Sequence, residues 1–208
     1  WGAFSEILAR DYGCRVTALT VSQAQYDYAR NRIAHAGLAN SVDIRFQDYR
    51  DVEGKYDRIA SIEMLEAVGE KFWAGFFKTM ENRLAHDGII GLQAITIEDE
   101  RYKSYRRGAD FIQTYIFPGG MLPSPSLLGD HAKAGGFEVS DTFTFGKSYA
   151  DTLGRWSVRF DDAWHDIAAL GFDERFRRIW NYYLAYSEAG FRLGTINVGQ
   201  YLLKRREG

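Results

Sequence analysis

The chain has 208 residues, enough for one α/β domain of ordinary size or for a domain with one small additional lobe. Its 26 Lys and Arg residues nearly balance 28 Asp and Glu residues, and the net charge of −2 argues against a nucleic-acid-binding protein. A single cysteine excludes an internal disulfide framework and favours a reducing, cytoplasmic location.

The first half of the chain alternates between helical and strand-like patterns. Helices are predicted up to about residue 13, over 22–35 and over 70–84, and strands over 15–20, 42–46, 56–62 and 88–97. Ser22, with Gln25 three residues later, predicts a capping box, and residues 86–88 predict a turn. The alternation implies βαβ units and a mainly parallel sheet, which binds ligands at the carboxyl ends of its strands.

The second half is less regular. A basic and aromatic stretch (101–108) and a Pro-Gly-Gly turn segment (117–124) precede a short helix (126–135), a strand (137–145), two long helices (149–170 and 173–191) and a closing strand (195–203). No repeat, low-complexity stretch or linker interrupts the pattern. We therefore expect a single domain over residues 1–208.

Polar residues follow the first two predicted strands. Thr20 and Gln25 are the plausible hydrogen-bonding groups for a nucleotide-like ligand, although Gln25 could instead only close the capping box. Asp48 could accept a proton of an adenine amino group and Tyr49 could stack beside it, or the pair could simply cap a loop.

The third and fourth strands are followed or interrupted by further polar residues. Glu63 and Glu66 lie among apolar residues after the strand 56–62, and a buried carboxylate needs a partner; the alternative is that both favour the dipole of the following helix. Gln93 lies inside a predicted buried strand and would need several hydrogen-bond partners.

Other reactive residue types give weaker signals. None of the four histidines has a second ligand at metal-binding spacing, so we predict no metal site, and we expect Cys14 to be a plain buried thiol. Aromatic residues make up 15% of the chain, most simply as core. The basic stretch contains Arg101, Lys103, Arg106 and Arg107; it suits either an anionic membrane surface or a solvated helix face.

Five ordered sequence blocks carry a resemblance to a known family. They are SIEMLEAVG (61–69), GLQAITI (91–97), DFIQTYIFPGGMLPS (110–124), YADTLGRW (149–156) and YYLAYSEAGFR (182–192). Together they resemble the cyclopropane-fatty-acyl-phospholipid synthases, S-adenosylmethionine-dependent enzymes related to the mycolic acid cyclopropane synthases. The resemblance covers essentially the whole chain. It implies a Rossmann-like methyltransferase fold, with a mainly parallel sheet flanked by helices and with inserted helices that form an acyl-chain pocket.

The beginning of the chain resembles the end of the family's glycine-rich turn. The residues concerned are Trp1-Gly2-Ala3-Phe4. We therefore expect the chain to be a fragment that lacks the first strand and the amino-terminal segment carrying the family's active-site cysteine. Cys14 does not match that cysteine.

The resemblance also implies site residues. S-adenosylmethionine would be bound by Gly2, Thr20, Val21, Gln25, Asp48 and Tyr49. A bicarbonate ion would be held by Glu66, Gln93, the Ile95 backbone and Tyr149. Many members have His at the positions of Gln93 and Ala67; Gln93 can still donate a hydrogen bond, but it cannot become cationic. The acyl-chain pocket would include Tyr115, Phe117, Tyr183, Tyr186 and Glu188.

The implied activity is transfer of a methylene group to the cis double bond of an unsaturated phospholipid acyl chain, which gives a cyclopropane fatty acid. An alternative is a lipid or small-molecule methyltransferase with a methyl or methylene product, and another is a catalytically silent lipid- or cofactor-binding protein. We expect a cytoplasmic enzyme that binds peripherally at the inner membrane surface, and a homodimer is a further expectation.

Overall fold

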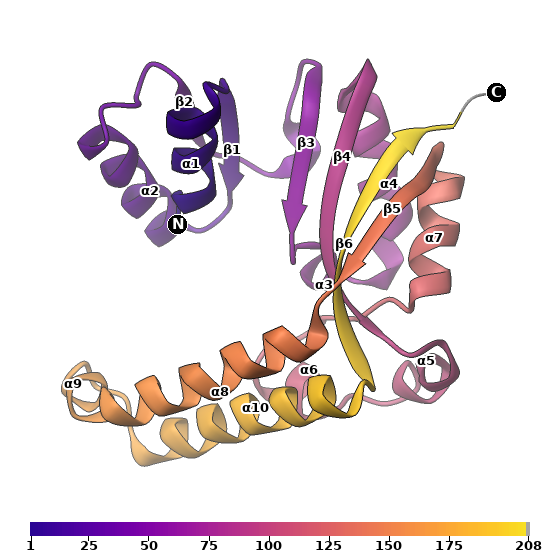
Figure 1. Ribbon diagram of the computed structural model, residues 1–208. Coiled ribbons are helices and arrows are strands. Elements are labelled where there is room, and N and C mark those ends of the chain that lie inside the picture. Colours follow the sequence, from indigo (N-terminus) through magenta and orange to yellow (C-terminus); the bar gives the residue numbers. More distant parts are fainter. Residues whose placement is uncertain (207–208) are drawn as a thin grey trace. The chain divides into compact units, whose positions relative to one another are not determined.

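The computed structural model describes residues 1–206, and the chain divides into two compact units. The first unit extends from Trp1 to Gly54 and the second begins at Lys55 (Figure 1). Within the described residues, no helix is both long and apolar enough to cross a membrane.

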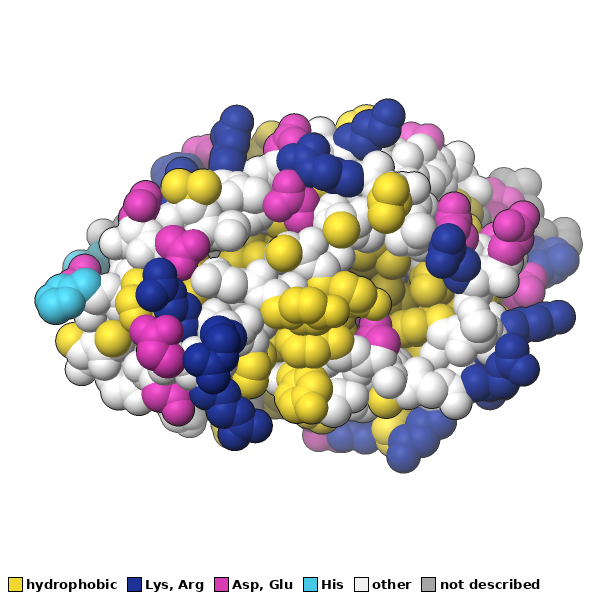
Figure 2. All heavy atoms as spheres, turned by 90° about the horizontal axis from the view of Figure 1, so that it is seen from below, with side chains coloured by type: hydrophobic (Ala, Val, Ile, Leu, Met, Phe, Trp, Pro, Cys, Tyr) yellow, Lys and Arg dark blue, Asp and Glu magenta, His cyan; other side chains and the backbone are white. Residues whose placement is uncertain are grey.

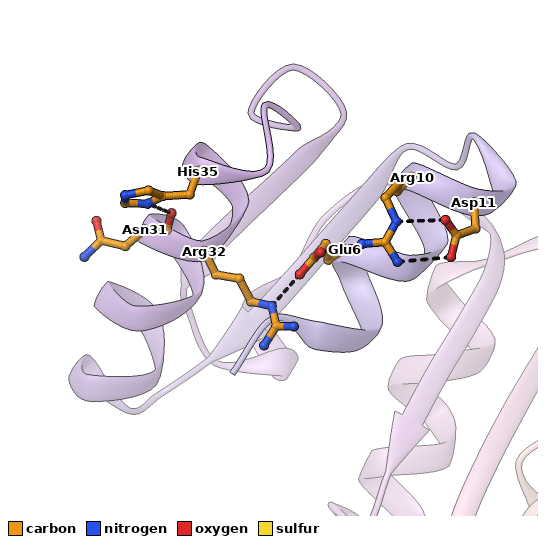
Figure 3. Close-up of polar contacts among 6 residues, drawn as sticks. All are labelled: Glu6, Arg10, Asp11, Asn31, Arg32 and His35. Carbon is orange, nitrogen blue, oxygen red and sulfur yellow. Dashed lines mark hydrogen bonds and ion pairs between the residues drawn. The ribbon is translucent and has the colours of Figure 1, made fainter.

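The first unit is a small βαβ arrangement. Its elements are α1 (Ala3–Tyr12), β1 (Val16–Thr20), α2 (Gln23–His35), β2 (Val42–Phe46) and the 3-10 turn η1 (Tyr49–Asp51). The strands β1 and β2 pair in parallel, with Thr20 opposite Phe46, so the residues that follow the two strands lie at one edge. Ile33 of α2 is buried against Ala9 and Val42. Arg32 of α2 also pairs with Glu6 of α1 at 2.5 Å (Figure 3).

The second unit contains a four-stranded sheet in the order β3-β4-β6-β5. Its strands are β3 (Tyr56–Ile62), β4 (Leu84–Ile97), β5 (Phe137–Thr144) and β6 (Ile196–Arg205). β3 and β4 are parallel, whereas β6 is antiparallel to both of its neighbours. Its helical segments are α3 (Leu65–Val68), the 3-10 turn η2 (Glu70–Phe72), α4 (Trp73–Arg83), α5 (Asp99–Tyr105), α6 (Phe111–Tyr115), α7 (Pro125–Ala134), α8 (Gly146–Asp162), α9 (Trp164–Ala169) and α10 (Glu174–Leu193).

Two groups of buried side chains stabilise this unit. On α4, the side chains of Trp73, Phe76 and Phe77 are each only 1% exposed, and His131 of α7 lies against Trp73 and Phe77. The helices α8 and α10 form a long hairpin (Figure 1), whose buried residues are Ala150, Leu153, Leu184, Phe191 and, from β6, Val198. The hairpin core therefore continues into the sheet through Val198.

Two predictions around the start of β4 are wrong. Residues 86–88 form no separate turn, because they belong to β4, which begins at Leu84. They lie where the register of the β3–β4 pair shifts, between the pairs Tyr56–Leu84 and Arg58–Ile89. Arg205 of β6 donates to the Leu84 carbonyl at 2.9 Å and holds this end of the strand. The helix predicted over 70–84 begins as the 3-10 turn η2, and only Trp73–Arg83 is α-helical.

The long helix predicted over 149–170 is interrupted. α8 ends at Asp162 and α9 begins at Trp164. Asp161 accepts hydrogen bonds from Arg177 and Asn181 of α10, so the end of α8 is tied to the returning helix.

The prediction of a buried Cys14 thiol is also wrong. Cys14 is exposed, because it lies in the connection between the α1 C-cap, Gly13, and the start of β1 at Val16. Its side chain therefore lies outside the core formed by Ala9, Ile33 and Val42.

Candidate functional site

The principal cluster of polar side chains in the second unit begins where β3 ends. Glu63 directly follows β3, and its φ of 51° lies in the left-handed region, which is costly for a residue with a side chain. Its backbone N–H still donates to the Gln93 carbonyl of β4 at 2.9 Å. The chain then enters the short helix α3, which carries Glu66.

The carboxylate of Glu63 is held by two donors from different elements. Gln93 Nε2 donates to Glu63 Oε1 at 2.8 Å, and the Tyr149 hydroxyl of α8 donates to Glu63 Oε2 at 2.9 Å. Gln200 Nε2 of β6 donates to Gln93 Oε1 at 3.0 Å, which fixes the direction of the Gln93 amide. We call Glu63, Gln93, Tyr149 and Gln200 the carboxylate clamp. Because an ionised carboxylate has about four acceptor positions, Glu63 keeps free ones beside these two.

Glu66 lies in a different environment. Its Oε1 accepts a hydrogen bond from the Ile95 N–H at 2.5 Å, whereas its Oε2 is buried and has no partner among the described residues. Burial raises the pKa of Glu66 to about 7, the hydrogen bond from Ile95 opposes this rise, and the charge of nearby Glu63 adds to it. The Glu66 carboxyl group thus titrates near neutral pH and not near its ordinary value of 4.5.

Aromatic rings line the clamp on the side of the α8–α10 hairpin. The Tyr149 ring packs against Phe191 with centroids 4.9 Å apart, and burial together with the Glu63 carboxylate raises the pKa of Tyr149. Tyr183 is half-buried, burial raises the pKa of its hydroxyl, and its ring meets Phe117 edge to face at 6.1 Å. We call Tyr149, Tyr183 and Phe117 the aromatic wall. Its rings supply π faces on the hairpin side of the polar clamp, and Phe117, which is 53% exposed, forms its outer end.

The predicted acyl-pocket residues separate into three places. Tyr183 and Phe117 belong to the aromatic wall just described. Tyr115 and Tyr186 belong to a second, exposed aromatic cluster, whose members are Phe111, Tyr115, Tyr182 and Tyr186. Glu188 pairs with Arg192 on α10 at 2.7 Å.

The predicted cofactor residues all lie in the first unit. Thr20 donates to the Gln25 side chain at 2.8 Å, and the Ser22 N–H donates to the Thr20 hydroxyl at 3.1 Å. Ser22 accepts a hydrogen bond from the Gln25 N–H, as the predicted capping box requires. The second bond of the box, from the Ser22 N–H to the Gln25 side chain, is not formed, because the Thr20 hydroxyl binds both the Ser22 N–H and the Gln25 side chain. Val21, between them, is 69% exposed.

The next predicted group follows β2. Asp48 accepts from the Arg50 N–H at 2.9 Å and pairs with its guanidinium at 2.8 Å, which lowers the pKa of Asp48. Because the Gln47 N–H donates to the Thr20 carbonyl at 3.0 Å, the segments after β1 and β2 are adjacent. Gly2 has a φ of 84°. A Cβ added at Gly2 would lie only 3.1 Å from the Ala29 Cβ, so the position favours glycine.

A family model for mycolic acid cyclopropane synthetase matches residues 1–201. The chain belongs to this family. Among curated relatives, the chain is 42% identical over 209 residues to "Tuberculostearic acid methyltransferase UfaA1" of Mycobacterium tuberculosis, covering 99% of this chain and 48% of the relative. It is 34% identical over 205 residues to "Cyclopropane-fatty-acyl-phospholipid synthase" of Escherichia coli K12, covering 99% of this chain and 51% of the relative. The chain thus spans about half the length of these curated relatives.

A solved structure of the same family confirms the predicted fold. The crystal structure of mycolic acid cyclopropane synthase CmaA1, complexed with SAH and CTAB, superposes with a TM-score of 0.91 at 28% identity and covers 99% of this chain and 75% of that chain. The chain therefore has the Rossmann-like methyltransferase fold.

Sequence reasoning singled out Glu63 and Glu66 as a pair but placed only Glu66 in the site. The structure joins Glu66 to Ile95, and it joins Gln93 and Tyr149 to Glu63. The signal for Glu63 was its position directly after a strand, beside a polar residue in the neighbouring strand.

Proposed function

We propose that this chain is the catalytic part of an S-adenosylmethionine-dependent enzyme that transfers one carbon to a cis double bond in a phospholipid acyl chain, with a cyclopropane fatty acid as its product. The observation that carries the proposal is the pair of carboxyl groups, Glu63 and Glu66, beside the aromatic wall of Tyr149, Tyr183 and Phe117 in a chain of this family. A carboxylate can accept a proton there, and aromatic faces can stabilise positive charge on an acyl chain.

The first unit supports binding of the methyl donor. Asp48 accepts three hydrogen bonds from Arg50 and keeps an acceptor position for a hydroxyl or amino group. Thr20 and Gln25 supply polar groups at the same edge of β1 and β2. The exposed Val21 side chain adds an apolar contact between them. This donor set fits S-adenosylmethionine, with Gly2 and Tyr49 completing the predicted binding residues. When bound, S-adenosylmethionine supplies an electrophilic methyl group.

The second unit would do the chemistry on the lipid. Positive charge on the acyl chain would be quenched by water, so a dry pocket is required. Tyr149 and Tyr183 supply ring faces for such a pocket, and each cation–π contact would contribute on the order of 0.5–2 kcal/mol. Tyr115, Tyr186 and Glu188 remain predicted pocket residues nearer the surface.

Bicarbonate is the proton acceptor that the family resemblance implies, and the residues predicted to hold it do not fit it. The Ile95 N–H donates to Glu66, while Gln93 and Tyr149 donate to Glu63. The Ile95 N–H and the Tyr149 hydroxyl are thus already engaged by carboxyl groups of the chain, and Gln93 has used one of its two amide N–H groups. We therefore assign no step to bicarbonate.

A second product is favoured by a specific observation. The relative that is 42% identical carries the name of a methyltransferase, whereas the cyclopropane synthase named above is 34% identical. A methyl-branched or methylene fatty acid is therefore the alternative product of the same site.

The deciding experiment is product analysis. The full-length protein is incubated with S-adenosylmethionine carrying a deuterated methyl group and with vesicles of cis-unsaturated phospholipid, and the fatty acids are analysed by mass spectrometry and NMR. Ring protons with two retained deuterium atoms support cyclopropanation, and an exocyclic alkene or a CD₃ branch supports the alternative. No label in any lipid would contradict both and leave a catalytically silent binding protein.

We further propose that the enzyme is cytoplasmic and acts peripherally at the inner membrane surface. Figure 2 views the side of the α8–α10 hairpin and shows hydrophobic side chains gathered on it. Tyr115, Tyr182 and Tyr186 of the exposed aromatic cluster are 43–56% exposed. Tyr186 donates to Asp110, three residues after Arg107 at the end of the basic stretch. Rings beside basic residues suit an anionic lipid surface. A homodimer stays a prediction.

A further inference from the structure

The clamp around Glu63 is organised as a binding site for one carboxylate or a similar planar anion. Two neutral donors, the Gln93 amide and the Tyr149 hydroxyl, point at its two oxygens from β4 and α8. Gln200 fixes the Gln93 amide so that its NH₂ group faces Glu63. The group that occupies this binding site is a side chain of the protein itself, the Glu63 carboxylate.

The backbone at Glu63 is adapted to put its side chain there. A φ of 51° is uncommon for a residue other than Gly, Asn or Asp. Such strain persists where the surrounding structure holds it, and it is frequent at functional sites. Here the N–H bond to Gln93 and the two side-chain bonds hold the residue in place.

Glu63 is better placed than Glu66 to exchange a proton with a bound molecule. One Glu66 oxygen is bonded to the Ile95 N–H, and the other is buried without a partner among residues 1–206. Glu63 is half-buried at the end of β3 and has free acceptor positions.

We propose that the Glu63 carboxylate is the resident proton acceptor of the reaction, so that the enzyme needs no dissolved bicarbonate. This inference rests on the proposed function. The alkene supplies the electron pair of the new C–C bond, while the C–S bond of the donor breaks and its electrons stay on sulfur. The acyl chain is left with one positive charge and loses one proton to Glu63. The electrons of that C–H bond form the ring bond. For a methylene product, a hydride first shifts between the two former alkene carbons, so that the charge lies on the carbon bearing the new methyl group, and the electrons of the C–H bond then form the exocyclic double bond. Glu63, now a carboxylic acid, returns its proton to solvent.

The test compares the wild-type full-length protein with Glu63→Gly and Glu63→Gln, assayed in CO₂-free buffer and with added bicarbonate. Wild-type turnover should be the same within twofold in both buffers. Both variants should lose about 100-fold or more, since general bases typically contribute 10²–10⁴-fold. Bicarbonate should restore Glu63→Gly at least tenfold, because Gln93 and Tyr149 then have free donors, and it should not restore Glu63→Gln, whose amide still fills the clamp.

A second measurement does not depend on turnover. Binding of ¹³C-labelled bicarbonate, followed by NMR line broadening, should be seen with Glu63→Gly and not with the wild type. Glycine suits the positive φ, and unchanged circular dichroism checks that the variant folds. Glu138→Gln, an exposed glutamate on β5, is the matched control and should behave as wild type.

Three results would overturn the inference. They are bicarbonate binding by the wild type, a fall in wild-type turnover when bicarbonate is removed, and wild-type turnover by Glu63→Gln. If the wild type modifies no lipid in any buffer, the proposed function fails by itself. In that case, bicarbonate binding to Glu63→Gly but not to the wild type would still support the clamp as an anion-binding site. Failure of bicarbonate to bind to Glu63→Gly would count against the clamp as such a site.

Discussion

Glu63 and Glu66 are three residues apart, yet their carboxyl groups have different surroundings. Two side-chain donors hold Glu63, whereas Glu66 has one backbone donor and one buried oxygen without a partner among the described residues. Burial is the largest cause of the raised pKa of Glu66, and the charge of Glu63 contributes less. We therefore attribute the pH sensitivity of this region to Glu66.

The raised pKa makes a prediction for stability. Between the unperturbed value of 4.5 and about 7, the folded chain binds more protons at Glu66 than the unfolded chain does. The stability that Glu66 contributes is thus complete below pH 4.5 and is lost as pH rises through 7. Glu66→Gln, which cannot ionise, should match the wild type at pH 4 and exceed it by up to about 3 kcal/mol at pH 8. Urea unfolding at both pH values measures this; a constant difference between the two proteins would contradict it.

The sequence could identify the two glutamates but could not choose between their roles. Their position after a predicted strand, near Gln93, indicated that at least one has a partner. Which one faces Gln93 depends on the backbone at Glu63, whose positive φ no local pattern reveals in a glutamate. Similarly, Gln25 was predicted to close a capping box, and only the structure shows that the Thr20 hydroxyl binds it.

At the scale of elements, the periodic segments were predictable and their ends were not. The parallel pairs β1–β2 and β3–β4 follow the predicted alternation of strands and helices. The errors lie where tertiary contacts override local signals. Residues 86–88 have turn-forming types but continue β4, whose beginning is held by Arg205 from the far end of the chain.

The helix α7 offers a test of packing with two glycines in one segment. A Cβ at Gly129, inside the helix, would meet nothing within 4 Å, whereas one at Gly135, the C-cap, would lie 2.7 Å from Phe77 Cβ. Gly129→Ala should stabilise the protein by about 0.5–1 kcal/mol, because alanine is the better helix former. Gly135→Ala should destabilise it by about 1–3 kcal/mol, because the buried Phe77 must move. Thermal unfolding compares the two, and equal shifts would refute the contact at Phe77.

At the scale of the whole molecule, the fold class was predictable because the sequence blocks extend over the whole chain. The TM-score of 0.91 to CmaA1 confirms it. That the chain is a single domain stays a prediction, which rests on the lack of a linker-like segment in the sequence. The boundary between the two compact units, after Gly54, lies between segments of ordinary composition, so composition alone could not indicate it. Surface charge was also hard to predict, because Arg101 pairs with Glu98 and Arg106 with Glu70. Half of the basic stretch is thus partly neutralised by partners that sequence order does not reveal.

This pairing decides which charges we expect to matter for the proposed membrane binding. Lys103 and Arg107 lie on the same stretch as the paired arginines and precede the exposed aromatic cluster. Near an anionic bilayer each basic residue contributes about 1 kcal/mol. Replacing both, as Lys103→Gln with Arg107→Gln, should therefore weaken binding to anionic phospholipid vesicles about 30-fold. The matched control is Lys133→Gln with Lys204→Gln, which removes the same charge from exposed positions on α7 and β6. Vesicle sedimentation at low salt measures both pairs. An equal loss in the control would mean that net charge, and not this surface, governs binding.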